Sequence, residues 1–182
     1  MHPVRYLRQV NTHRKLVRKY CFRLGLYRQG LTHDLSKYSP AEMLCGAKYY
    51  SDHRGPVSAE RRDIGVSNSW LHHKGRNKHH PEYWIDYTID PEGHVGFGPG
   101  KMPAAYIAEM FCDSVAAGKV YLGDKYTNSV PYDRFMRNRN NMQIHPETAD
   151  EYEKILSILK DQGEDAAFRY VRNWMKSEGR KR

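Results

Sequence analysis

The chain has 182 residues, which is enough for one domain with a sizeable core and short for two. Its 30 Lys and Arg residues exceed 21 Asp and Glu, so the net charge of +9 favours an anionic partner such as a nucleotide or a nucleic acid. No apolar run could span a bilayer, and no signal-peptide core follows the basic N-terminus, so we expect no membrane partner. The three cysteines form no CxxC pair, which fits a reducing compartment. We therefore expect one cytoplasmic domain over residues 1–182.

The N-terminal region predicts a helix and then a capped second helix. Apolar residues recur at three- and four-residue steps between positions 4 and 27, and His13 lies within that apolar stripe. Residues 39–42, Ser-Pro-Ala-Glu, match a capping box, in which Ser39 caps a helix that begins at Pro40 and Glu42 reaches back to the cap. Three polar residues precede that helix: His33, Asp34 and Lys37.

The middle of the chain combines a helix, two His-His doublets and a long loop. Ser58 predicts the cap of a helix with Ile64 and Leu71 facing inward, ending near Gly75. The doublets are His72-His73 and His79-His80. Residues 86–102 are rich in Gly and Pro and lack helical periodicity, so we expect a long loop that can include a short hairpin and serve as a lid.

The C-terminal third predicts three helices. The first opens at Pro103 and carries Glu109 and Asp113 one turn apart. Its inward positions are Ile107, Met110, Phe111, Ser114 and Val115. A second helix begins near Thr148, which we expect to cap it, and the last carries Phe168, Val171, Trp174 and Met175 inward, before a basic tail, residues 176–182, that we expect to fray. No segment alternates like a strand, so the predicted class is all-α.

Eight side chains form a candidate metal site. They are His13, His33, Asp34, His72, His73, His79, His80 and Asp113. Imidazole with carboxylate suits a borderline divalent ion, and the absence of Cys favours a centre with open coordination positions over a structural zinc knot. The four doublet imidazoles lie close in sequence to three cations, Lys74, Arg76 and Lys78, so protonating the imidazoles would add to an already positive region. A bound metal would keep these rings neutral. We expect one or two ions of Mn, Fe, Zn, Ni or Co, with at least one ligand from each doublet.

This ordered series resembles the HD-domain superfamily of metal-dependent phosphohydrolases, whose signature is a His, a later His-Asp pair and a distant Asp on separate helices. The matching positions here are His13, His33-Asp34 and Asp113, and the doublets fall where two-metal members have further histidines. The string "HDLSK" resembles the His-Asp-Ile-Gly-Lys form of the two-metal branch, which implies that Lys37 contacts the substrate phosphate. Together "LTHDLSKYSP", "HHKGRNKHHPEYW" and "EMFCDS" resemble an uncharacterised family of small bacterial and phage proteins related to this fold.

The resemblance implies an HD-domain-like helical bundle and a phosphohydrolase or phosphodiesterase that acts on a nucleotide or similar small phosphate ester through a metal-bridging hydroxide. Asp34 would bridge two metals, and Lys37 would neutralise the phosphate. A doublet histidine that is not a ligand, with His72 and His79 as candidates, would protonate the leaving group. The Gly-Tyr-Pro motif of the cyclic di-GMP branch is missing, so that branch's substrate is not carried over.

Several roles stay open in the sequence. Arg76 and Asn77 either reach a substrate phosphate or shape the turn between the doublets. Glu109 either orients a ligand or is structural. Two other functions compete with hydrolysis: a di-iron oxygenase on the same fold, and a non-enzymatic nucleic-acid-binding protein with a structural metal.

Overall fold

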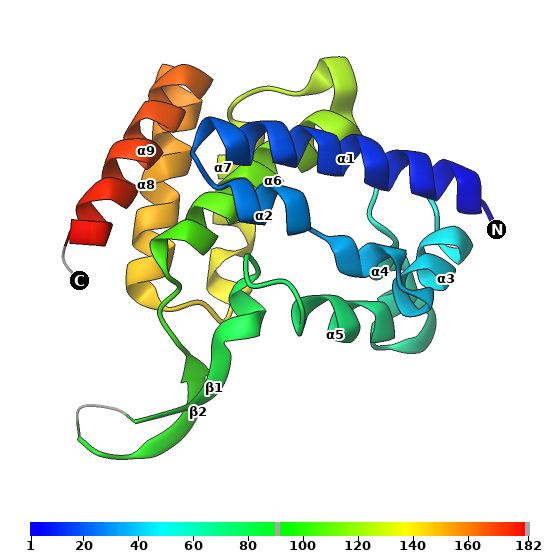
Figure 1. Ribbon diagram of the computed structural model, residues 1–182. Coiled ribbons are helices and arrows are strands. Elements are labelled where there is room, and N and C mark those ends of the chain that lie inside the picture. The colour runs from blue at the N-terminus through cyan, green and yellow to red at the C-terminus, as the bar shows by residue number, and fades with distance from the viewer. Residues whose placement is uncertain (90–91, 181–182) are drawn as a thin grey trace.

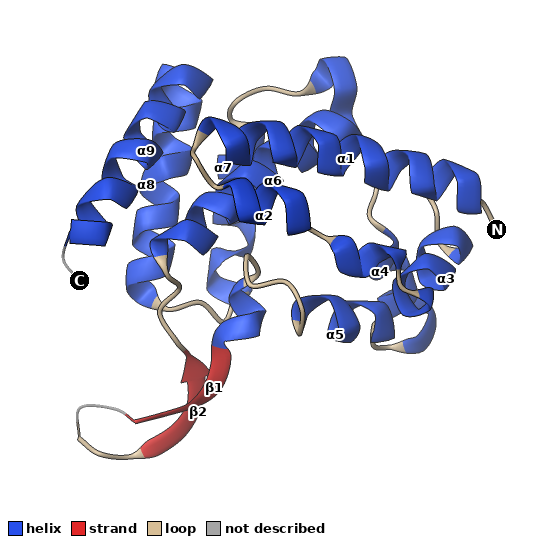
Figure 2. Cartoon of the chain, in the orientation of Figure 1, coloured by secondary structure: helices blue, strands red, loops and turns tan. Residues whose placement is uncertain are grey.

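A computed structural model describes residues 1–89 and 92–180 (Figure 1). The chain is 72% helical, and residues 1–89 and 92–180 contain one sheet of two strands, so the predicted all-α class is confirmed (Figure 2). No helix in the described part of the chain is long and apolar enough to cross a membrane.

The α-helices of the described residues are α1 (Pro3–Arg23), α2 (Tyr27–Thr32), α3 (Pro40–Lys48), α4 (Pro56–Ile64), α5 (Asn68–Lys74), α6 (Ala104–Leu122), α7 (Val130–Asn138), α8 (Pro146–Gln162) and α9 (Glu164–Arg180). Four 3₁₀ turns connect them: η1 (Leu35–Tyr38), η2 (Pro81–Trp84), η3 (Gly123–Lys125) and η4 (Arg139–Asn141). The strands β1 (Ile85–Ile89) and β2 (Val95–Pro99) form an antiparallel hairpin.

The hydrophobic core surrounds α6, which packs against α1, α8 and α9. Phe111 and Val115 of α6 are fully buried, as are Val17 of α1 and Leu156 of α8. The paired helices α8 and α9 occupy one end of the molecule, and α3, α4 and α5 occupy the other (Figure 1). The helix α1 spans the length between the two ends, so its residues reach both the core and the polar region beside α3 and α5.

Two of the predicted helices have the expected inner faces. In α6, Ile107, Met110, Phe111 and Val115 are buried, and Ser114 is half-buried. In α9, Phe168 and Val171 are buried, while Trp174 and Met175 pack against the core at its margin. The predicted amphipathic helix over residues 4–27 is present as α1, but it ends at Arg23, before the predicted end, because Gly25 takes a left-handed backbone conformation with φ of +80°.

The single helix predicted between residues 58 and 74 is wrong. Gly65, with φ of +78°, ends α4, and a second helix, α5, begins at Asn68. Ile64 and Leu71 are 50% and 51% exposed instead of facing inward. The inner face of this region is polar because the buried carboxylate of Glu60 accepts hydrogen bonds there, so the apolar side chains turn outward.

None of the three predicted side-chain caps forms. The helix α4 begins at Pro56, with Gly55 at its cap position, so Ser58 lies within the helix instead of capping it. The helix α3 does begin at Pro40, but Ser39 makes no side-chain cap and Glu42 does not reach back to it. The helix α8 begins at Pro146, two residues before Thr148, whose buried hydroxyl accepts a hydrogen bond from the Met102 backbone N–H at 3.1 Å. Tertiary partners take two of the side chains that the local patterns assigned to caps: Glu42 binds His72 and His73, and Thr148 binds Met102.

The expected loop at 86–102 forms most of the β1–β2 hairpin, in which Ile85 pairs with Pro99 and Ile89 with Val95. The hairpin projects away from the helical body instead of folding over it, so the structure gives no support to a lid (Figure 1). Residues 90–91 of that prediction lie outside the described residues. The tail is not frayed as expected, because α9 continues to Arg180; residues 181–182 lie outside the described part.

Candidate metal centre

Three sets of described side chains could hold a metal ion, and one of them, His33, His79 and Glu109, shares a histidine with each of the other two. The first of those other two groups joins side chains from α1, the turn after α2, and α6. Its members, His13, His33 and Asp113, each offer one ligand atom, and these atoms lie within 4.8 Å of one another. The Nε2 atom of His13 lies 2.9 Å from Asp113 Oδ1 and 3.3 Å from His33 Nε2. We call these three residues the His13 group.

The second group contains Asp34 with three of the four doublet histidines, His73, His79 and His80. The Nε2 atoms of His73 and His80 lie 2.9 Å apart, and His73 Nε2 is 3.3 Å from Asp34 Oδ1. The helix α5 supplies His73, and the turn after it supplies the other two. We call these four residues the His73 group.

Asp34 lies between the two groups and presents one carboxylate oxygen to each. Its Oδ1 atom faces the His73 group, with His79 Nε2 at 3.6 Å, and its Oδ2 atom faces the His13 group, with His33 Nε2 at 3.5 Å. Among non-glycine residues in the described chain, Asp34 alone has a positive φ, +54°. This conformation is uncommon for a side-chain-bearing residue and marks a functional position when the surroundings hold it in place.

Arg14 holds the backbone around this turn. Its Nε–H donates to the His33 carbonyl oxygen at 2.7 Å, and one terminal nitrogen donates to the Leu31 carbonyl oxygen at 3.1 Å. The other terminal nitrogen donates to the Tyr38 hydroxyl at 2.8 Å. One guanidinium therefore fixes both sides of the turn that places Asp34 between the ligand groups.

Two unpartnered atoms fit the interpretation of a metal site. Asp34 Oδ1 and His79 Nε2 are buried, and neither has a hydrogen-bond partner among the described residues. A buried acceptor without a partner costs about 1–3 kcal/mol unless something else satisfies it. Because both atoms belong to the His73 group and both carry lone pairs suited to a divalent ion, a metal accounts for them.

The charges within the groups already favour ligation. Burial would raise the pKa of the Asp34 carboxyl, but His33, Lys37 and the neighbouring imidazoles outweigh it and hold that pKa well below its usual range. Burial, together with the nearby His79 and His73, lowers the pKa of His80 well below its usual range. Asp34 is therefore ionised and His80 neutral at pH 7, which are the forms that bind metal.

His33 differs from His80 because it is close to three carboxylates. Burial would lower its pKa, but Asp34, Asp113 and Glu109 outweigh burial and raise it well above its usual range. A divalent ion in the His13 group would take the place of that proton, so metal binding should release protons.

Two glutamates hold the ligand imidazoles from behind. Glu109 Oε1 lies 2.9 Å from His33 Nδ1 and 3.2 Å from His79 Nδ1, so it contacts one ligand of each group. Glu42 Oε2 lies 2.7 Å from His73 Nδ1, and its Oε1 lies 2.7 Å from His72 Nδ1. A carboxylate that accepts the Nδ1–H fixes the tautomer and leaves Nε2 free for a metal.

Three other residues that the sequence predicts for the site lie outside both the His13 group and the His73 group. His72 is in neither ligand group, because its Nδ1 contacts Glu42 from the half-exposed face of α5. Asn77 donates to the His73 carbonyl oxygen and to Ser36 Oγ, both at 2.8 Å, so it holds the turn between the doublets. Arg76 is exposed and donates to the His72 carbonyl oxygen at 3.1 Å.

Lys37 lies at the edge of the centre, with Nζ 3.1 Å from Asp34 Oδ2. Burial opposes its charge, but Asp34 outweighs burial and raises the pKa of the ammonium group. The lysine is therefore a fixed positive charge beside the bridging carboxylate, and part of its side chain remains exposed.

Sequence reasoning missed two residues of the site, Arg14 and Glu42. The sequence pattern assigns Glu42 to a helix cap, because its spacing from Ser39 fits that local motif. No sequence pattern distinguishes Arg14, since one arginine among many on α1 looks like an ordinary exposed charge. The contacts that reveal both residues are made across elements distant in sequence.

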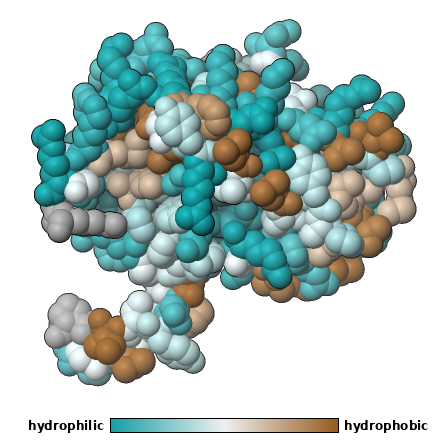
Figure 3. Space-filling model, in the orientation of Figure 1, coloured by the Kyte–Doolittle hydropathy of each residue, from teal (hydrophilic) through white to brown (hydrophobic). Residues whose placement is uncertain are grey.

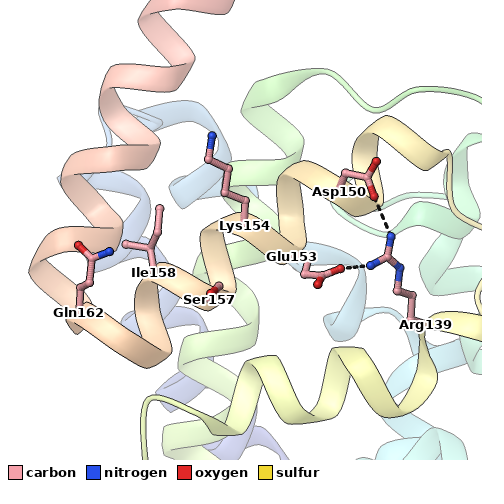
Figure 4. Close-up of a pocket in the computed structure, with 7 residues that line it drawn as sticks. All are labelled: Arg139, Asp150, Glu153, Lys154, Ser157, Ile158 and Gln162. Carbon is pink, nitrogen blue, oxygen red and sulfur yellow. Dashed lines mark hydrogen bonds and ion pairs between the residues drawn. The ribbon is translucent and has the colours of Figure 1, made fainter.

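A hollow elsewhere on the surface, of about 730 Å³, lies along α8 (Figure 4). Arg139 at its edge is paired with Asp150 at 2.7 Å and with Glu153. None of the residues that line this hollow belongs to either ligand group, and its one arginine is neutralised by these partners. The hollow therefore offers no alternative to the metal centre.

Comparison with known proteins gives a family without an assigned activity. The sequence model of a family described as "Family of unknown function (DUF5662)" matches residues 2–158. The match includes every residue of both ligand groups. No curated protein and no solved structure matches the chain.

Proposed function

This chain belongs to the DUF5662 family, and we propose that it is a metal-dependent phosphohydrolase that acts on a nucleotide or a similar small phosphate ester. The observation that carries the proposal is Asp34, whose two oxygens face two separate ligand groups while Lys37 lies 3.1 Å from one of them. Two divalent ions bridged in this way would act as Lewis acids and make coordinated water a nucleophile near neutral pH.

The chain's own residues supply the remaining requirements. His33 and His79 are held through Nδ1 by Glu109, and His73 is held by Glu42, so the ligand atoms are oriented before any metal binds. Lys37 adds a positive charge that can bind a non-bridging phosphate oxygen as negative charge develops on it. The net charge of +9 favours approach of an anionic substrate.

The order of the ligands along the chain also supports the likeness to the HD-domain phosphohydrolases. A His on the first helix, a His-Asp pair after the second helix and an Asp on a later helix match that family's pattern, with the doublets between them. Both phosphomonoester and phosphodiester substrates remain within the proposal.

The test is product formation by protein loaded separately with Mn, Fe, Zn, Ni or Co. Nucleotides, cyclic nucleotides and short oligonucleotides serve as substrates, with phosphate release and chromatography as readouts. We expect turnover with at least one metal, and its loss in Asp34→Asn, which keeps the side-chain volume but removes the bridging charge. Asp63→Asn, which alters an exposed carboxylate paired with Lys48, is the matched control and should retain activity.

Failure of folded, metal-loaded protein to release product from any of these substrates would contradict the proposal. Oxygen consumption by the iron form, with a diol or phosphonate, would instead indicate the di-iron oxygenase. Salt-sensitive nucleic-acid binding that survives Asp34→Ala would indicate a binding protein with a structural metal.

A further inference from the structure

The β1–β2 hairpin has an apolar face that its own chain does not cover. Its cross-strand pairs Tyr87–Phe97 and Ile89–Val95 place four large side chains on one side, because partners in register point to the same face. These side chains are 68–75% exposed. The hairpin protrudes below the helical body, and its apolar side chains are visible in the space-filling view (Figures 1 and 3).

Such a hairpin needs a partner to be well ordered. Two strands alone are only marginally stable in water, and an apolar face this exposed marks an interaction site. The rings of Tyr87 and Phe97 pack edge to face, with centroids 5.7 Å apart, so the face is preorganised. The question is therefore which surface covers it.

A second apolar surface lies at the junction of α4 and α5. We call its three residues, Ile64, Val66 and Leu71, the α4–α5 patch; they are 46–51% exposed. Ser67 caps α5 by accepting from the Trp70 N–H at 3.0 Å, so Val66 and Leu71 occupy the two positions that pack together beside such a cap. The hairpin and the helix α5 both lie toward the lower side of the molecule in Figure 1.

The charges of the two surfaces are complementary. Residues 85–99 contain three acidic residues and no Lys or Arg, so all 30 basic residues lie elsewhere. Arg61, Arg62 and Lys74 lie near the α4–α5 patch in the sequence, and the neighbouring Asp63 is paired with Lys48, so the remaining charge beside the patch is basic. An acidic hairpin is repelled by anionic lipid and by nucleic acid. An apolar patch with basic residues at its edge is complementary to the hairpin in both charge and polarity.

We propose that two copies of this chain form a symmetric dimer by reciprocal exchange, in which the apolar face of each hairpin packs on the α4–α5 patch of the other copy. Each of the seven exposed side chains would bury on the order of 100 Å², so each copy would bury about 700 Å². Two such contacts bury about 1,400 Å² in total, which is within the range of stable specific interfaces. Each copy gives the same pair of surfaces, as two-fold symmetry requires.

The test is the mass of the full chain in solution, measured by light scattering and sedimentation between about 1 and 100 µM. We expect twice the 21.4 kDa monomer mass for wild type. Phe97→Glu and Leu71→Glu should each weaken dimerisation at least about tenfold, because each places a charge in both contacts. Tyr87→Glu repeats the hairpin test at a second position. Leu31→Glu, at a side chain 54% exposed on α2, is the matched control and should remain dimeric.

Mixing the two variants distinguishes this geometry from other dimers. A mixed dimer of Phe97→Glu with Leu71→Glu keeps one contact free of substitutions, so the mixture should dimerise better than either variant alone. Far-UV circular dichroism checks that all variants fold. A monomeric wild type would overturn the proposal. A Leu71→Glu variant that dimerises like wild type would also overturn it, because that result is expected if the two hairpins pair with each other.

Discussion

Replacing Glu42 by Ala gives a quantitative test of how the His73 group is held. Glu42 is buried, and its two oxygens lie 2.7 Å from the Nδ1 atoms of His72 and His73. The substitution leaves the Nδ1–H of the buried His73 without its carboxylate and frees that ring to rotate. The half-exposed His72 can bond to water instead, so most of the cost arises at His73.

The expected magnitude follows from these contacts. Loss of a carboxylate that orients a ligand histidine lowers metal affinity about 10- to 100-fold, or about 1.4–2.7 kcal/mol. Loss of one buried, charge-assisted hydrogen bond lowers the free energy of unfolding of the metal-free protein by about 1.5–3 kcal/mol. The histidines of the His13 group contact Asp34 and Glu109 instead of Glu42, so the metal affinity of that group should change by less than about twofold.

The assay is competition with a chromophoric chelator, together with elemental analysis and urea unfolding. Wild type should bind two ions and the Glu42→Ala variant should lose one of them selectively, while Glu42→Asp should restore part of the affinity. Glu147→Ala is the control, because that exposed carboxylate pairs with Lys101, away from both ligand groups. Equal weakening of both ions, or no weakening of either in folded protein, would refute the proposed positioning.

Three further predictions concern other parts of the structure. Gly46→Ala should lower the free energy of unfolding by about 1–3 kcal/mol in urea, because its Cβ would lie 2.1 Å from ring atoms of Tyr6; a neutral effect would contradict that packing. Burial would raise the pKa of Glu60, but hydrogen bonds from hydroxyl, thiol and backbone donors outweigh burial and lower that pKa. The ionised Glu60 therefore stabilises the fold above pH 4.5, and this stabilisation is lost as the pH falls through the lowered pKa. Glu60→Gln should therefore flatten the acid limb of stability against pH, and an unchanged limb would refute this. Lys37→Met should tighten metal binding, because it removes a cation 3.1 Å from Asp34 Oδ2, yet lower kcat/KM for a phosphate ester; weaker metal binding would refute it.

The local patterns of the sequence correctly predicted the buried face of a helix where the interior of the protein is apolar. The face of α6 that carries Ile107 and Phe111 was predicted correctly because the two residues contribute to a hydrophobic core at helical spacing. The same reasoning failed at Ile64 and Leu71, because the interior beside α4 and α5 is filled by buried polar groups. Periodicity identifies the apolar side of a helix, and in this region the apolar side is the outer one.

The sequence by itself determined the helical class and the inventory of ligand-type residues, including their order from His13 to Asp113, because helix formation and ligand chemistry depend on residue type and short-range spacing. Only the tertiary structure decided that His73, and not His72, joins a ligand group and that Glu42 binds imidazoles instead of capping α3. The direction of a side chain within such a doublet depends on the packing of helices that are distant in sequence, and no local pattern records that packing.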